Sequence, residues 1–149
     1  MYLDTSALLK RYFKEPYSNE LLAKWKEATQ IITSSVAYAE TMASFYRKKR
    51  EVDLSSKVFN KLVNSFHLDW EAFIRVEVND SINETVHKVV ARHPLRGFDA
   101  IHLASAIITH ERINEAFLFA CFDQRLINSA QMEGLATFPA PPSLGHNPK

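Results

Sequence analysis

The sequence has very little cysteine, no long apolar run and almost no net charge, and each absence excludes a class of protein. Its single cysteine, Cys121, can form neither an internal disulfide nor a thiolate cage for a metal ion. The position of Cys121 at the end of an apolar segment, residues 117–121, predicts a small buried side chain rather than a nucleophile. No apolar run approaches the length of a membrane span, so we expect no membrane partner.

The net charge of +1 on 149 residues gives no overall field that would attract a nucleic acid or a membrane. A polyanionic partner must therefore be met by a local patch. The chain starts with a short apolar segment that no basic leader precedes, which predicts a cytoplasmic protein. The length fits one domain, expected over residues 1–138, with a flexible tail over residues 139–149 that is rich in proline and glycine.

Strand-like and helix-like patterns alternate along the whole domain. After a first short strand that ends at Asp4 and the helix behind it, the expected strands are residues 31–33, 73–76, 116–121 and 135–138. The expected helices are residues 18–28, 36–50, 54–67, 80–92, 99–111 and 123–131, with Ser34 or Ser35 and then Asn79 as helix caps. This alternation predicts a three-layer α/β/α sandwich with a mainly parallel sheet.

Three aspartates are expected at the carboxyl edge of that sheet, where ligands bind in open α/β folds. Asp4 ends the first strand, Asp123 follows the strand 116–121 by two residues, and Asp99 opens the helix 99–111. Each of them alone is equally consistent with an ordinary helix cap or a first-turn acid, which the helix dipole favours. The case for chemistry therefore depends on whether other acidic residues reach the same edge.

Glu40 is the acid that an ordinary cap does not explain. It lies four residues after Val36 and three before Ala43, on or beside the apolar, small-residue face of its helix. A carboxylate in such a position must be paired or bound to a cation. One interpretation is a salt bridge to a neighbouring arginine; the other is that Glu40 points to the edge where Asp4 and Asp99 lie.

Four carboxylates in one cleft raise one another's pKa values unless a cation lies between them. Ligands that are all oxygen, with no cysteine, select a hard divalent ion, Mg²⁺ or Mn²⁺. Magnesium needs only one or two direct carboxylates, and the remaining acids would then orient water for attack on a phosphodiester. This pattern predicts a metal-dependent nuclease with Asp4, Glu40, Asp99 and Asp123 as catalytic acids.

The same residues carry a resemblance to a known family. The segments that carry it are Leu3-Asp4-Thr5-Ser6-Ala7-Leu8, Ala39-Glu40, Phe98-Asp99-Ala100-Ile101-His102-Leu103-Ala104 and Phe122-Asp123-Gln124-Arg125-Leu126. In order and spacing they resemble the PIN-domain ribonucleases, and more narrowly the VapC toxins of prokaryotic toxin–antitoxin pairs. The segment around Asp99 is the most specific of the four. The resemblance covers the chain from its first residue to about residue 138.

The resemblance implies a parallel sheet of about five strands with an acidic pocket that binds Mg²⁺. It also implies RNA cleavage, homodimerisation and inhibition by a cognate antitoxin. Asp4, Glu40, Asp99 and Asp123 match the acidic positions of the family, with Asp4 and Asp99 expected as the metal ligands. A further match is the hydroxyl of Thr5 or Ser6, which supports the first aspartate.

Two arginines and one histidine lie near the acids in the sequence. Arg96 and Arg125 flank Asp99 and Asp123 and are the candidates for binding RNA phosphates. His102 lies one helical turn after Asp99 in an apolar helix, which favours a buried histidine with hydrogen-bond partners over a base or ligand.

Two other function classes fit the sequence less well. A phosphoryl-transfer domain with an aspartate nucleophile needs a second acid two residues after the first, where this chain has Ser6, and a lysine late in the sheet. A catalytically weak PIN-like module that only binds RNA or a partner would be expected to lose acids, and all four are present.

Overall fold

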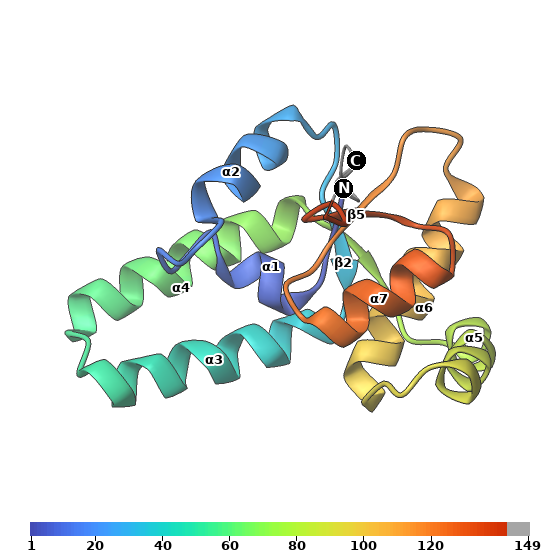
Figure 1. Ribbon diagram of the computed structural model, residues 1–149. Helices are drawn as coiled ribbons and strands as arrows, with labels where there is room; N and C mark the ends of the chain where they lie inside the picture. Colours follow the sequence, from blue (N-terminus) through green and yellow to red (C-terminus); the bar gives the residue numbers. More distant parts are fainter. Residues whose placement is uncertain (143–149) are drawn as a thin grey trace, which may run out of the picture.

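A sheet of five parallel strands forms the centre of the molecule, as the computed structural model shows (Figure 1). The strands, which the sheet arranges in the order β3-β2-β1-β4-β5, are β1 (Tyr2–Leu3), β2 (Ile32–Ser34), β3 (Ile74–Val76), β4 (Leu118–Ala120) and β5 (Ala136–Phe138). The structure describes residues 1–142, so most of the expected tail lies outside the described residues. The predicted parallel α/β fold is confirmed.

Two sets of helices cover the two faces of the sheet (Figure 1). The first face carries α1 (Thr5–Leu9), α2 (Ser18–Glu27), α3 (Ala37–Val52) and α4 (Ser56–Ala72), and the second carries α5 (Asp80–Arg92), α6 (Gly97–Arg112) and α7 (Gln124–Met132). The two residues of β1 separate the two cores, because neighbouring residues of a strand point to opposite faces. Tyr2 packs with α5, α6 and α7, whereas Leu3 packs with the other four helices.

The strand order places β1 in the middle of the sheet, between β2 and β4. The backbone N–H of Asp4 continues this pairing, since it donates to the carbonyl of Ala120 over 3.1 Å. Asp4 is therefore fixed at the centre of the carboxyl edge. The helices that follow β1, β2 and β4 all begin at this edge, which brings residues from distant parts of the sequence together.

Three expected helix boundaries were wrong. Helix α4 continues to Ala72 rather than ending near His67, because Asp69 and Trp70 make tertiary contacts with Tyr12 and Tyr38. Neither Ser34 nor Ser35 is the N-cap of α3; that residue is Val36, which has no side-chain cap.

Helix α6 begins two residues earlier than expected, at Gly97, with Arg96 as its N-cap. Asp99 is therefore a first-turn acid and not the residue that opens the helix. Within residues 1–142, no helix has the length and apolar character needed to cross a membrane.

Candidate active site

Asp4 is a buried aspartate at the centre of the carboxyl edge, with 3% of its surface exposed. Its Oδ1 accepts a hydrogen bond from the backbone N–H of Ala7 over 2.9 Å, so Asp4 is the N-cap of α1 as the sequence allowed. Burial raises its pKa, although His102 and the hydrogen bonds from Ala7 and Ser6 oppose the shift. A buried carboxyl group with a raised pKa is typical of a functional site, whereas helix capping alone lowers a carboxyl pKa.

The two hydroxyls after Asp4 have different partners. Ser6 Oγ donates to Asp4, with 2.7 Å to Oδ1 and 2.9 Å to Oδ2, and it accepts from the backbone N–H of Phe122 over 2.9 Å. Thr5 Oγ1 instead donates to Glu40 Oε1 over 2.7 Å. Ser6 is therefore the hydroxyl that supports the first aspartate, and it also ties β1 to the segment that precedes Asp123.

Glu40 is held by a histidine rather than by an arginine. Its Oε1 lies 2.8 Å from Nε2 of His102, and its side chain is 25% exposed. Burial raises the pKa of Glu40, but the hydrogen bonds from His102 and Thr5 outweigh it and leave the pKa below its ordinary value. Glu40 is thus an ionised carboxylate that α3 presents to the start of α6.

Asp99 is a partly buried carboxyl group in the first turn of α6. Burial raises its pKa most, followed by the negative charges of Asp123, Asp4 and Glu40. Carboxylates from three other segments therefore act on Asp99 at this edge. Asp99 is the acid whose pKa the other three raise, and a cation placed among them would relieve this repulsion.

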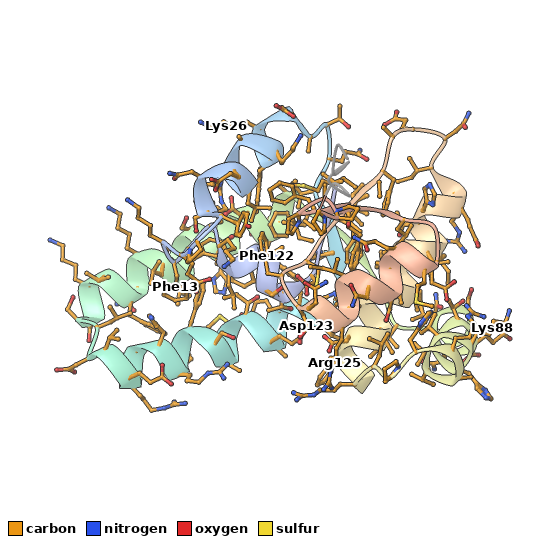
Figure 2. The ribbon with its side chains drawn as sticks, viewed as in Figure 1. Phe13, Lys26, Lys88, Phe122, Asp123 and Arg125 are labelled. Carbon is orange, nitrogen blue, oxygen red and sulfur yellow. The ribbon has the colours of Figure 1, made fainter. Side chains whose placement is uncertain are left out.

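Asp123 and Arg125 lie at the beginning of α7 (Figure 2). Asp123 is exposed and caps α7, because its Oδ1 accepts from the backbone N–H of Leu126 over 3.0 Å. A cavity of about 340 Å³ separates this segment from the start of α6, and it is lined by Pro94, Leu95, Arg96, Asp99, Asp123, Gln124 and Arg125. A somewhat larger cavity of about 410 Å³ lies beside β3, and none of the predicted site residues lines it.

The donor set at this edge suits a hard cation, because the acidic groups supply only oxygen. Within residues 1–142, no three side chains of the metal-binding types already converge on one point. Magnesium does not need such a cage, since one or two direct carboxylates and several waters satisfy it. Asp4 and Asp99 are the candidate pair for such an ion, because the charge of Asp4 is among those that raise the pKa of Asp99. Cys121 is buried, and burial raises the pKa of its thiol, so it is no competing ligand or nucleophile.

Sequence reasoning placed His102 correctly as a buried histidine with partners but missed which partners it has. The imidazole lies 2.9 Å from the hydroxyl of Tyr2 through Nδ1, and it meets both Glu40 and Thr5 through Nε2. The available signal was spacing, because His102 is one turn after Asp99 and so lies on the same side of α6.

Comparisons with known proteins agree with this architecture. A family model described as "PIN domain" matches residues 1–130. Two curated relatives from Mycobacterium tuberculosis, named Ribonuclease VapC45 and Ribonuclease VapC49, are each 29% identical over 140 residues, which is 94% of this chain and 95% of the relative.

Several solved structures share the fold. The crystal structure of FitAcB from Neisseria gonorrhoeae has a TM-score of 0.64 at 14% identity and covers 92% of this chain and 95% of its own. The structure of VapBC2 from Rickettsia felis, bound to a DNA fragment from the promoter, has a TM-score of 0.63 at 12% identity, with 91% and 95% covered. A toxin-antitoxin complex from Klebsiella pneumoniae has a TM-score of 0.61 at 16% identity, with 83% and 87% covered. At these identities the likeness concerns the fold alone.

Proposed function

The chain belongs to the PIN domain family, and from this premise we propose that it is a metal-dependent endoribonuclease that hydrolyses RNA phosphodiester bonds. The two relatives named as ribonucleases support this class of reaction. The observation that carries the proposal is Asp99, whose pKa is raised by burial and by the charges of Asp123, Asp4 and Glu40. A cation bound beside Asp99 would relieve this repulsion, and perturbed pKa values of this kind cluster at functional sites.

In this proposal Asp4 and Asp99 hold Mg²⁺, with Mn²⁺ as a substitute, because both are carboxyl groups with raised pKa values and no cationic side chain pairs with either within residues 1–142. The bound cation supplies positive charge and Lewis acidity for the attack of water on the phosphodiester. Asp4 is already oriented for this role, since Ser6 and Ala7 fix both of its oxygens.

Glu40 and Asp123 are the acids that orient water and accept its proton. Glu40 suits this role because it is ionised and its Oε1 is fixed by Thr5 and His102. Arg96 and Arg125 line the cavity beside Asp99 and Asp123 and make no ion pair within the described residues. Their guanidinium groups are therefore free to bind phosphate oxygens on either side of the cleaved bond.

RNA cleavage with and without metal tests this function. Purified protein should cut single-stranded RNA in Mg²⁺ or Mn²⁺ and stop in EDTA, and added Mg²⁺ should raise the melting temperature because it relieves repulsion among the carboxylates. Full activity in the chelator would contradict the metal-dependent mechanism. RNA binding without cleavage in either metal would favour the alternative, a catalytically weak PIN-like module.

We further propose that the chain is the toxin of a toxin–antitoxin pair, that a cognate antitoxin binds it, and that it acts in the cytoplasm as a homodimer. The names of its relatives and of its structural neighbours support the pairing. Expression of the chain alone should arrest growth, and co-expression of a short open reading frame beside its gene should restore it. Unhindered growth with active enzyme in the cell would indicate a housekeeping nuclease instead.

The homodimer is tested separately by light scattering, which should give a molecular mass of twice the 17.1 kDa of one chain.

A further inference from the structure

The buried imidazole of His102 connects the interior of the second core to the acidic edge. It lies on α6, only 1% of its side chain is exposed, and its two nitrogens have partners on different elements. Nδ1 meets the hydroxyl of Tyr2 from the central strand over 2.9 Å, and Nε2 meets Glu40 Oε1 from α3 over 2.8 Å. A buried polar group with two specific partners restricts the side chains that it joins.

The chemistry of the partners fixes the direction of these hydrogen bonds. An ionised carboxylate can only accept, so the hydrogen between His102 and Glu40 must be on Nε2. In a neutral imidazole Nδ1 then carries a lone pair, and the Tyr2 hydroxyl donates to it. The result is a chain of donors that runs from Tyr2 through His102 to Glu40.

Both donors to Glu40 reach the same oxygen. Thr5 Oγ1 and His102 Nε2 lie 2.7 and 2.8 Å from Oε1, and within residues 1–142 Oε2 has no hydrogen-bond partner. Two bonds to one oxygen remove the rotation of the carboxylate and leave the other oxygen available. Because Thr5 also follows Asp4 directly, the same contacts couple the orientation of Glu40 to β1.

We propose that His102 is a positioning residue whose imidazole, oriented by Tyr2, holds Glu40 Oε1 so that Oε2 faces the reacting water. The inference rests on the proposed ribonuclease function and adds two residues to it, neither of which touches substrate. Removing such a supporting hydrogen bond costs roughly 10- to 100-fold in activity in comparable sites. Substitution of His102 or Tyr2 should therefore lower kcat and leave KM unchanged, because neither side chain binds RNA.

A pair of amide substitutions separates positioning from packing. The amide of His102→Gln reaches the place of Nε2 and retains a donor to Glu40, whereas the amide of His102→Asn reaches only the place of Nδ1. Both variants lose the imidazole and place an amide in the core. We expect kcat per folded molecule to be about tenfold higher for His102→Gln than for His102→Asn. Equal kcat for the two variants would overturn the proposal.

The chain offers a matched control in a second buried histidine that meets a glutamate. His93 Nε2 lies 2.7 Å from Glu133 Oε1, and the His93 side chain is 5% exposed. His93→Gln and His93→Asn should lower the melting temperature but give the same kcat per folded molecule. A difference between the two His93 variants as large as that between the His102 variants would show that the amide pair reports stability alone, and it would overturn the assignment.

The hydrogen-bond chain can also be tested on the unaltered protein without RNA. A long-range ¹H–¹⁵N correlation spectrum should show the His102 hydrogen on Nε2 and none on Nδ1, and Tyr2→Phe should leave that hydrogen on Nε2, because Glu40 alone requires a donor there. A hydrogen on Nδ1 in the unaltered protein would overturn the proposal. If the unaltered protein does not cleave RNA, the proposed function fails, and the spectrum still decides whether this chain of donors exists.

Discussion

At the scale of the residue, Asp4 and Asp123 each serve as a helix cap at the acidic edge. Asp4 accepts from Ala7 at the start of α1, and Asp123 accepts from Leu126 at the start of α7. A cap requires a side-chain oxygen, whereas a ligand for a hard cation also requires negative charge. Substitution by asparagine therefore distinguishes the two roles, because it retains the oxygen and removes the charge.

Asp4→Asn should lose roughly 100-fold or more in RNA cleavage, and Asp123→Asn roughly tenfold, because Asp123 is exposed and in the proposed mechanism orients water rather than holding the cation. The melting temperature of Asp4→Asn should change little, since removal of a buried charge offsets the bond lost from Ser6. Cleavage rates at saturating Mg²⁺, with melting curves on the same samples, check this. Unchanged cleavage by both variants would show that the two aspartates are caps only.

The gathering of Asp4, Glu40, Asp99 and Asp123 at one edge was predictable from sequence, because each follows a strand or lies on a recognisable helix face. The hydroxyls were not, because Thr5 and Ser6 are adjacent and only the three-dimensional position of Glu40 decides which hydroxyl serves which acid. The hydrogen-bond partners of His102 could not be predicted from sequence for the same reason, since they come from β1 and α3.

At the scale of the element, α5 and α7 are joined at their carboxyl ends by one carboxylate. Glu133 Oε1 lies 2.8 Å from Arg92 Nε and 2.7 Å from His93 Nε2. Burial raises the pKa of Glu133, but its bonds with Arg92 and His93 outweigh this effect and hold the pKa below its ordinary value of 4.5. These contacts hold together the ends of two helices that cover the same face of the sheet.

The lowered pKa of Glu133 makes its contribution to stability dependent on pH. A carboxyl group with a lower pKa in the folded protein stabilises it above the unfolded pKa, and this stabilisation is lost as the pH falls through the folded value. Glu133→Gln should thus lower the melting temperature most near neutral pH, with the difference shrinking below pH 4.5. Melting curves of both proteins from about pH 7 to about pH 3 measure this. A difference that grows on acidification would contradict the assigned pairing.

Sequence periodicity located every helix and strand of the described residues but not all of their ends. Helix α4 runs to Ala72 because Asp69 accepts from Arg11 and Tyr12, two residues some sixty positions earlier whose proximity no local pattern reveals. Helix α6 begins at Gly97 without a side-chain cap, so no cap residue in the sequence marks its start. Ends that are set by tertiary contacts cannot be derived from a local period.

At the scale of the whole molecule, the strand order brings the acids together. With β1 between β2 and β4, the segments that follow these three strands meet at one edge, and α6 adds Asp99 from the second face. The alternation of strands and helices predicted a parallel sheet but not this order. The order depends on which strands pair, and this pairing is set by contacts between distant residues, such as that between Tyr2 and Phe119.

The most direct test of the account is RNA cleavage by Asp99→Asn, with Asp80→Asn as its matched control. Both aspartates lie in the first turn of a helix, but Asp80 begins α5 beyond the edge strand β3, and its charge is not among those that raise the pKa of Asp99. In Mg²⁺, Asp99→Asn should lose roughly 100-fold or more in cleavage rate with an unchanged or raised melting temperature, whereas Asp80→Asn should cleave like the unaltered protein. Cleavage by Asp99→Asn at the rate of the unaltered protein would contradict the assignment of the acidic edge as the active site.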